Sequence, residues 1–517
     1  MDETLVLRPR PPAAPPLRDA VLAGAFLGEA HRDGAERLAA FLASPATRAA
    51  LDTWFGAAAA GIAGDADRLR AALDRDIAAL DEAIGRQLDA ILHHPRMTRF
   101  EGRWRGLSWL VDRVEPGRRV KLRVLPVAWP EICRDLERAA EFDRSHLFRL
   151  VYEDEFGIAG GEPFGLLVVD HEVRHRPGPG SPTDDVSALA SLAEVAAAAF
   201  APVILSAHPA LLDVDDWRGL QSVLDVTAPL GGAEHARWRS LSSRADLRFV
   251  GVTLPRLLAR PPWRDDPARV DRFRYAERSA SAADRVWMAA SYGFAAAACR
   301  AFQEHGWPAD VRGVEPDRIG GGLIDGLPDE PFASGPPEAW QRAPTEIVLT
   351  DPQERALVDA GLMPVSAMPY AAELLFGAAR SLQAPARHMG ANAAAADASA
   401  RISAQLNALL CASRFAHYVK VMGRDMVGSF QTADEIDVRL NSWLQGYVNP
   451  NTKSGSETRA RYPLFEGRIT VQEKPGKPGV FGCVAHLRPY HQLDDVSATF
   501  MLMTEISAPG RRGAAGS

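Results

Sequence analysis

The stretch from Ser413 to Val448 constrains the fold most, because it predicts two amphipathic helices separated by a sharp break. The apolar residues before the break lie three or four positions apart, on one helical face: Phe415, Val419, Met422 and Met426. The break is at Gly428, and Thr432 with Glu435 has the spacing of a capping box for a second helix. The second apolar stripe comprises Ile436, Leu440, Trp443, Leu444 and Tyr447. Two such apolar stripes must be buried against other residues, either of this chain or of another chain.

Composition excludes several classes of protein. The chain has 517 residues, with 47% apolar and 24% charged residues and a formal net charge of −7, which is typical of a folded protein and unlike a general nucleic-acid binder. No apolar run reaches the length of about eighteen residues that a membrane span needs. The acidic, proline-rich start is unlike a signal peptide, so we expect a cytoplasmic protein. The cysteines lie far apart without a CxxC pair, which argues against a zinc site or a disulfide framework: Cys133, Cys299, Cys411 and Cys483.

A long helix is predicted from Asp65 to His94. Its apolar residues recur at steps of three and four, as in a heptad seam: Leu69, Leu73, Ile77, Leu80, Ile84, Leu88 and Ile91. Asp65 can cap its start, and Pro95 stops it. The seam needs a partner helix, either within this chain or in another chain.

The N-terminus combines a flexible, proline-rich arm, residues 1–16, with a possible short amphipathic helix from Leu17 to Ala30. The apolar face of this helix comprises Leu17, Val21, Leu22 and Phe26. It is either a fraying terminal helix or a docking peptide for another protein.

The middle of the chain predicts an α/β fold with a parallel βαβ unit, since a strand, a helix and a strand follow at suitable spacing. The expected strands are 147–152, 164–169, 202–206, 246–252 and 346–349, and the expected helices are 104–114, 186–200 and 285–305.

The C-terminal part predicts two strands, Glu466–Glu473 and Val480–Leu487, around the turn sequence KPGKPG. The final run, Val496–Glu505, is a third strand candidate. Its apolar face comprises Val496, Ala498, Phe500 and Leu502. This strand either completes the chain's own sheet or pairs with the sheet edge of another subunit.

Sequence motifs for catalysis or cofactors are absent. There is no phosphate-binding GxxxxGK[ST], no GxSxG and no HExxH, so we expect no enzyme activity, no cofactor and no metal. Ser206 with His208, and Asp170 with His171, follow predicted parallel strands, where α/β enzymes place catalytic groups. An α/β enzyme therefore stays as an alternative that rests on fold analogy alone.

Seven blocks of sequence, in order, resemble the large subunit of the type VI secretion contractile sheath, the TssC/VipB/ImpC family. These blocks are WRGLSWLVDR (104–113), FGIAGGEPFGLLV (156–168), WRSLSSRADLRFVGVTLPRLLAR (238–260), PTEIVLTD (344–351), SRFAHYVKVMGRDMVGSF (413–430), LNSWLQGYV (440–448) and RPYHQL (488–493). The resemblance covers roughly Asp65 to Ile506.

The resemblance implies a structural polymer with an α/β, multi-domain fold and a C-terminal domain like that of phage tail sheath proteins. Such subunits pair with a small sheath subunit (TssB/VipA type) and polymerise with copies of themselves around an inner Hcp tube, on a baseplate. Contraction delivers effectors, and a ClpV-type AAA+ unfoldase then dismantles the sheath. A sheath-like paralogue that acts as a cap or adaptor is the alternative, because the N-terminal arm departs from the family.

The resemblance also assigns roles to residues. The small-subunit interface comprises Leu69, Leu73, Ile77, Leu80 and Ile84. The inter-subunit strand comprises Val496, Ala498, Phe500 and Leu502, and unfoldase recognition involves Leu17, Val21, Leu22 and Phe26. The inner tube would face Asp434, Glu435 and Asp437. The expected domains are an N-terminal arm (1–60), an α/β sheath region (61–400), a C-terminal sheath domain (401–506) and a disordered tail (507–517).

Overall fold

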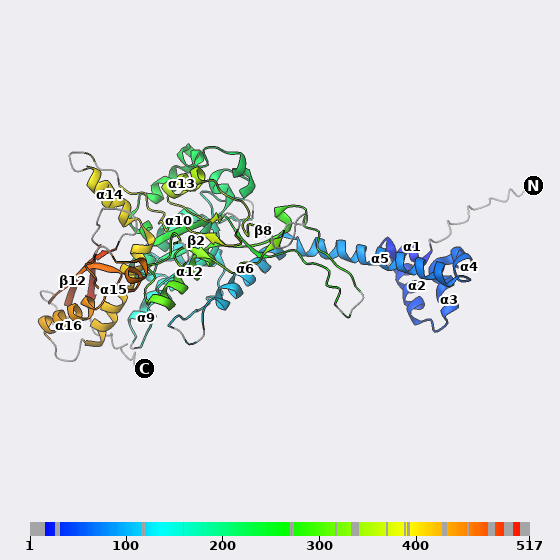
Figure 1. Ribbon diagram of the computed structural model, residues 1–517, viewed down its shortest axis with the longest axis horizontal. Helices are drawn as coiled ribbons and strands as arrows, with labels where there is room; N and C mark the ends of the chain where they lie inside the picture. The colour runs from blue at the N-terminus through cyan, green and yellow to red at the C-terminus, as the bar shows by residue number, and fades with distance from the viewer. Residues whose placement is uncertain are drawn as a thin grey trace, which may run out of the picture. The chain divides into compact units, whose positions relative to one another are not determined.

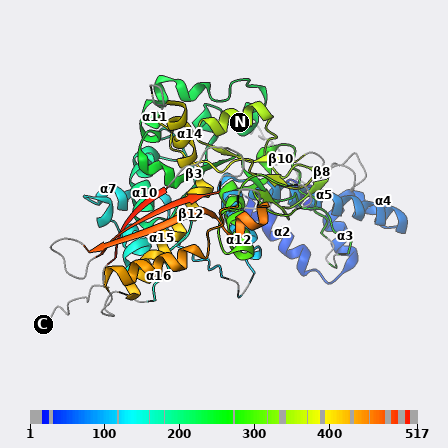
Figure 2. The ribbon, with the colours of Figure 1, turned by 60° about the vertical axis from the view of Figure 1, so that its left-hand side comes forward.

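In the computed structural model the chain forms two compact units (Figures 1 and 2). Unit 1 combines Met1–Met97 with Pro262–Asp284, and unit 2 combines Thr98–Pro261 with Arg285–Ser517. Unit 1 thus combines residues from two separate parts of the chain. The structure describes residues 16–25, 31–115, 117, 119–158, 160–178, 180–268, 270, 273–315, 318–331, 341–368, 371–386, 389, 393–426, 432–451, 454–473, 481–490 and 500–506.

Unit 1 is helical. Its helices are α1 (Leu17–Leu22), α2 (Arg32–Ala43), α3 (Thr47–Phe55), α4 (Ala59–Ile62) and α5 (Ala66–Leu92). The predicted long helix is confirmed as α5, and the Asp65 side chain caps it by accepting hydrogen bonds from the backbone N–H groups of Asp67 and Arg68. The apolar core of this unit is small and comprises Leu17, Val21, Trp54, Phe55, Ala59 and Ala72.

Unit 2 contains a four-stranded parallel sheet in the order β1-β2-β3-β9. Its strands are β1 (Leu167–Val173), β2 (Val203–Ala207), β3 (Val250–Leu254) and β9 (Met363–Pro364). Helix α10 (Asp185–Ala199) links β1 to β2, so the predicted βαβ unit is confirmed. Helix α12 (Ala290–His305) packs across β1, β2 and β3.

Shorter elements surround this sheet. The helices are α6 (Pro95–Asp112, which begins in unit 1), α7 (Trp129–Arg138), α8 (His146–Phe148), α9 (Asp154–Phe156), α11 (Ala236–Ser242) and α13 (Asp351–Asp359). The strands are β4 (Leu257–Arg260) with β5 (Val286–Met288), β7 (Glu330–Pro331) with β8 (Gln341–Arg342), and a sheet of β10 (Ser366–Ala367), β11 (Leu374–Leu375) and β6 (Leu323–Ile324).

The C-terminal part of unit 2 adds helices and an antiparallel sheet in the order β12-β13-β14. The elements are α14 (Ala393–Ser403), α15 (Leu406–Met426), α16 (Ala433–Gln445), α17 (Ser456–Arg461), β12 (Leu464–Glu473), β13 (Phe481–Pro489) and β14 (Phe500–Ile506). The two predicted strands around the turn are confirmed as β12 and β13. The alternate side chains of β13 are buried on one face: Phe481, Cys483, Ala485 and Leu487.

Helix α15 connects the two sheets through one continuous core (Figure 2). It packs against β13, β14 and α16, and its side chain Phe415 is only 1% exposed. The Phe415 ring stacks on Trp307 with 4.1 Å between ring centroids, and the rings of Trp443 and Tyr447 pack edge-on against it. The predicted capping box of α16 is confirmed, because Thr432 and Glu435 each bond the other's backbone N–H. The cover for the two apolar stripes therefore comes from this chain.

Two predicted strands are wrong. Residues 147–152 form helical turns, since Ser145 caps them by accepting from the Phe148 backbone N–H, and Phe148 and Val151 are buried at helical spacing. Residues 346–349 form no strand, and the neighbouring Thr345 makes only an isolated bridge to Leu257. Both are short apolar runs, for which periodicity does not separate strand from helix or loop.

Two other predicted elements are partly wrong. The predicted helix 285–305 begins instead with strand β5, and the predicted strand 246–252 begins with a tight helical turn, Ala245–Phe249, before β3. In each case the apolar residues are buried as predicted, but the main element begins several residues later than predicted.

Truncation of the central aromatic ring should destabilise unit 2. We predict that Phe415→Ala lowers the free energy of unfolding by about 3–5 kcal/mol, because it removes a buried ring and leaves a cavity. Chemical denaturation followed by tryptophan fluorescence measures this change. The control Val438→Ala removes a side chain that is 69% exposed and should change the stability by less than about 0.5 kcal/mol. Equal effects of the two substitutions would contradict the assigned core.

The stability of unit 2 should fall in mild acid because of His417. The buried His417 ring donates from Nε2 to the Ala199 carbonyl at 3.0 Å, and burial lowers the pKa of His417 to about 3. The unfolded chain takes up a proton near pH 6.5, so stability should decrease as pH falls from there toward 3, by at most about 1.4 kcal/mol per pH unit for this residue.

The variant His417→Gln keeps a donor for the Ala199 carbonyl but does not titrate. Its stability, measured by urea denaturation between pH 7 and about pH 4, should therefore fall less steeply than that of the wild type. Other histidines contribute equally to both proteins, so parallel pH profiles would refute the assignment.

Candidate functional site

Helix α5 in unit 1 carries an exposed stripe of branched apolar side chains. Leu73, Ile77, Ile84 and Ile91 are 38%, 50%, 47% and 51% exposed, and Ile77, Ile84 and Ile91 repeat every seven residues. We call these four residues the isoleucine stripe. An aliphatic stripe of this length on a folded helix is typical of a surface that packs against another helix.

The other two faces of α5 are covered within unit 1. Leu69 and Leu80 pack against the core formed with α1 and α3. On the polar face, residues 262–284 contact the helix: Tyr275 Oη donates to Asp89 at 2.7 Å, and Arg278 pairs with Glu82 at 3.2 Å. The predicted small-subunit residues therefore separate into two groups, with Leu69 and Leu80 partly buried inside unit 1 and Leu73, Ile77 and Ile84 at the surface.

Helix α1, the predicted unfoldase element, is docked in unit 1. Leu17 and Val21 are buried in its core, and Leu22 is half-buried. Arg18 donates to the buried carboxylate of Asp76 at 2.8 Å, and Trp54 donates to the same carboxylate at 2.8 Å. The helix is shorter than predicted, and Phe26 lies outside the described residues. Recognition by another protein would thus require α1 to leave this core.

The strand β14 lies at the edge of the C-terminal sheet. It pairs antiparallel with β13, with Leu502 opposite Ala485 and Phe500 opposite Leu487. Within the described residues it is the terminal strand, so one of its backbone edges bonds to no other strand. Of the two predicted possibilities, the chain by itself shows the third strand of its own sheet. Val496 and Ala498 lie outside the described residues.

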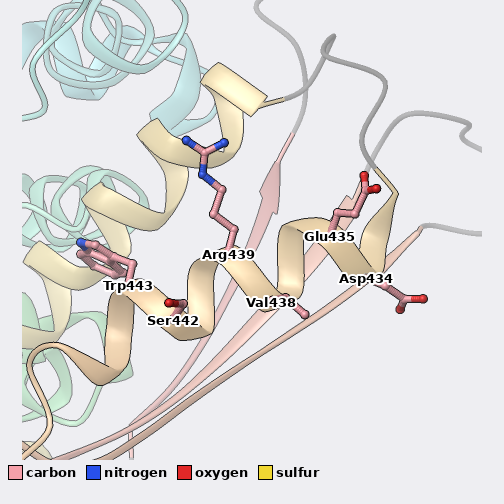
Figure 3. A pocket seen from close by; sticks show the side chains of 6 residues that line it. All are labelled: Asp434, Glu435, Val438, Arg439, Ser442 and Trp443. Carbon is pink, nitrogen blue, oxygen red and sulfur yellow. The ribbon is translucent and has the colours of Figure 1, made fainter.

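The first turns of α16 border a shallow hollow (Figure 3). Asp434 and Glu435 project from the start of the helix, with exposed Val438 and Arg439 one turn further on. Glu435 accepts a hydrogen bond from the Thr432 backbone N–H at 3.0 Å. The acidic residues also suit the positive end of the helix dipole, which is a structural reason for their position.

Asp437 does not belong to this exposed surface. Its carboxylate accepts from the Val471 backbone N–H and from the Asn441 amide, both at 2.9 Å, and so fixes α16 to strand β12. The sequence hypothesis grouped Asp437 with Asp434 and Glu435, whereas the structure places it inside the C-terminal part of unit 2.

The proposed catalytic pair at the end of β2 is not assembled. The Ser206 hydroxyl is buried and lies 2.9 Å from the Thr253 hydroxyl. The His208 ring accepts from Arg174 at 2.7 Å, and burial lowers the pKa of His208 to about 4. Among the described contacts no hydrogen bond joins Ser206 to His208, so the hydroxyl has no base beside it.

The second pair, Asp170 with His171, lies in the middle of β1 and not at its end, and both side chains are held by other partners. Asp170 accepts from the Tyr292 hydroxyl at 2.9 Å. The His171 ring stacks on Trp129 and lies 3.0 Å from the Asp185 carboxylate. These contacts fasten β1 to its neighbouring helices and support a structural role for both side chains.

Comparison with known proteins decides the family. The family of the EvpB/VC_A0108 tail sheath N-terminal domain matches residues 74–383, and that of the EvpB/VC_A0108 tail sheath gpW/gp25-like domain matches residues 395–506. The chain belongs to the EvpB/VC_A0108 tail sheath family. It is 34% identical over 435 residues to the type VI secretion system sheath protein TssC1 of Pseudomonas aeruginosa PAO1, covering 83% of this chain and 85% of that protein.

Two solved structures are similar at low identity. One is a cryo-EM structure of the anti-feeding prophage baseplate, with 10% identity, a TM-score of 0.33, and coverage of 76% of this chain and 80% of that chain. The other is a crystal structure of the sheath tail protein of Desulfitobacterium hafniense, with 9% identity, a TM-score of 0.28, and coverage of 62% and 60%. None of the helices in the described part of the chain is long and apolar enough to cross a membrane.

This member of the tail sheath family has exposed apolar surfaces that sequence reasoning missed. On α6, Phe100, Trp104 and Val111 are exposed. After α6, the extended residues 120–127 expose Leu122, Val124 and Leu125, and Lys121 of this segment forms an exposed ion pair with Glu162 at 2.6 Å. The alternation of apolar and basic residues in VKLRV is typical of a strand and was the available signal.

The docking of α1 should depend on the charge of Asp76. We predict that Asp76→Asn weakens α1 docking by about 1–3 kcal/mol, because Arg18 and Trp54 lose a charged acceptor. Hydrogen–deuterium exchange of residues 17–22 should accelerate accordingly. The control Asp74→Asn changes an exposed carboxylate on the same helix and should leave exchange unchanged. Unaltered exchange in Asp76→Asn would show that the apolar contacts alone hold α1.

Proposed function

We propose that this chain is the large structural subunit of a type VI secretion contractile sheath. It pairs with a small sheath subunit and polymerises around an Hcp inner tube in the cytoplasm. Contraction of the polymer on its baseplate delivers effectors, and a ClpV-type unfoldase recycles the subunits. The observation that carries the proposal is the isoleucine stripe, because it is a half-exposed apolar surface on a long helix in a member of a sheath family.

Assembly with the small subunit provides the direct test. Co-expression of the full chain with the small subunit from the same gene cluster, followed by negative-stain electron microscopy, should give hollow tubules. A chain that binds the small subunit but yields only caps or short adaptors at tube ends would support the alternative role. A chain that remains monomeric under conditions that assemble related sheaths would refute both roles.

The isoleucine stripe is the proposed small-subunit interface. Ile84→Asp should reduce capture of the small subunit at least about 100-fold, since a charge in an apolar interface costs roughly 3 kcal/mol or more. A pull-down with purified proteins measures the affinity. Ile84 is half-exposed, so the melting temperature of the free chain should hardly change. Leu80 is less suitable for this test because it packs inside unit 1.

The matched control is Ala90→Asp, which places the same charge on an exposed position of α5 outside the stripe. It should capture the small subunit as the wild type does. Wild-type capture by Ile84→Asp would contradict the assignment of this interface, and equal loss in both variants would indicate a general effect on α5.

The edge of β14 that pairs with no other described strand is the proposed site for strands from neighbouring subunits. A sheet that continues across subunits keeps them connected by backbone hydrogen bonds while side-chain contacts rearrange. We predict that backbone amides in residues 500–506 exchange hydrogen for deuterium more slowly in tubules than in the free chain. Amides of β12 are the internal reference. Equal exchange of β14 in both states would refute strand addition at this edge.

The exposed start of α16 is the proposed contact with the inner tube. Asp434 and Glu435 offer a charged surface, and such surfaces hold partners by weak, salt-dependent contacts. This would suit a tube that must be held and then released. Asp437 would act there indirectly, by fixing α16 to β12.

A further inference from the structure

Three titratable side chains meet beyond the carboxyl ends of β1 and β2 in unit 2. His175 follows β1 by two residues, Asp213 ends the turn Pro209–Leu212 after β2, and His235 ends the turn Ala233–His235. They come from separate segments, so no short motif announces them in the sequence. In α/β folds this edge of a parallel sheet is where ligands bind.

The three side chains are close enough to share one ion. One ligand atom from each, a ring nitrogen of each histidine and a carboxylate oxygen of Asp213, lies within 4.8 Å of the others. The two imidazole rings stack with 3.9 Å between centroids. Asp213 is exposed and both histidines are buried, so the cluster is open to solvent on the carboxylate side.

The buried ring nitrogens lack protein partners. His175 is 4% exposed, and neither of its ring nitrogens has a hydrogen-bond partner among the described residues. His235 is fully buried, and its Nε2 lies 2.9 Å from the Leu211 carbonyl, which can only accept. Nε2 therefore carries the proton, and the unpartnered Nδ1 presents a lone pair. A backbone carbonyl that orients a histidine in this way is the usual support of a metal ligand.

We propose that His175, Asp213 and His235 form a binding site for a divalent transition-metal ion of the Zn²⁺ type. Two imidazoles and one carboxylate are donors that Zn²⁺ accepts, whereas Ca²⁺ and Mg²⁺ prefer oxygen ligands throughout. Water would complete the coordination on the exposed side. The stacked His175 ring must turn so that the lone pairs converge, and this turn breaks no hydrogen bond to a described residue.

The charges around the cluster permit a cation. Arg176 and Glu234, the neighbours of the two histidines in the chain, form an ion pair with each other. Among the described residues the Asp213 carboxylate forms no ion pair, so its negative charge is available to a cation. A bound ion would link the loops after β1 and β2 to the turn before α11, and so fix this end of the sheet.

Zinc titration of the full, tag-free chain tests the proposal independently of sheath assembly. After dialysis against EDTA, Zn²⁺ is titrated in competition with a chromogenic chelator, and Co²⁺ binding is followed by its visible absorption. We expect the wild type to bind one more ion per chain than His175→Gln does. Zn²⁺ should raise the melting temperature of the wild type but not that of His175→Gln.

Asp213→Asn covers the case in which His175→Gln does not fold, because Asp213 is exposed. It should weaken Zn²⁺ binding at least tenfold. Its control, Asp215→Asn, removes an exposed carboxylate from the same loop and should bind like the wild type. A wild type that binds no ion in the micromolar range, or equal binding by Asp213→Asn and Asp215→Asn, would overturn the proposal.

Discussion

The stacking of Phe415 on Trp307 is the contact on which unit 2 depends. Trp307 follows α12, which covers the parallel sheet, and Phe415 lies on α15, which covers the antiparallel sheet. The edge-on rings of Trp443 and Tyr447 extend this contact to α16. A single apolar core therefore joins both sheets, and the C-terminal part cannot slide on the parallel sheet without exposing these rings.

Helix α5 in unit 1 is less completely buried than this core. Two faces of α5 contact other residues of unit 1, while the isoleucine stripe is exposed to solvent. Full burial of one such side chain contributes about 1.5–3 kcal/mol, so four partly exposed ones hold several kcal/mol for association. This distribution fits a subunit whose core is formed by its own chain, while the isoleucine stripe of α5 is buried only by a partner.

Local signals in the sequence predicted the best-defined elements. The cap at Asp65, the capping box at Thr432 and the alternation in β13 depend on neighbouring residues, and each is confirmed. Membership of the family could also be predicted from the sequence, because the family is recognised by blocks of sequence in a fixed order. The strand prediction for the short apolar run 147–152 was wrong. Its helical form depends on the cap at Ser145 and on burial, which the apolar pattern alone does not reveal.

The surfaces were harder to predict than the elements. Periodicity marked Leu80 and Ile84 as equivalent, yet Leu80 is partly buried against the core of unit 1, whereas Ile84 is 47% exposed. Asp437 lies among acidic neighbours in the sequence, but its role comes from the Val471 amide, 2.9 Å away. The cluster of His175, Asp213 and His235 arises only when three loops meet.

A cryo-EM reconstruction of tubules formed with the small subunit tests the central claim most directly. The claim is that the surfaces left uncovered in the free chain become the contacts of a polymer. The expected map shows a helix of the small subunit packed along Leu73, Ile77, Ile84 and Ile91, and a strand added beside β14. A map of ordered tubules in which the isoleucine stripe remains in solvent would contradict the claim.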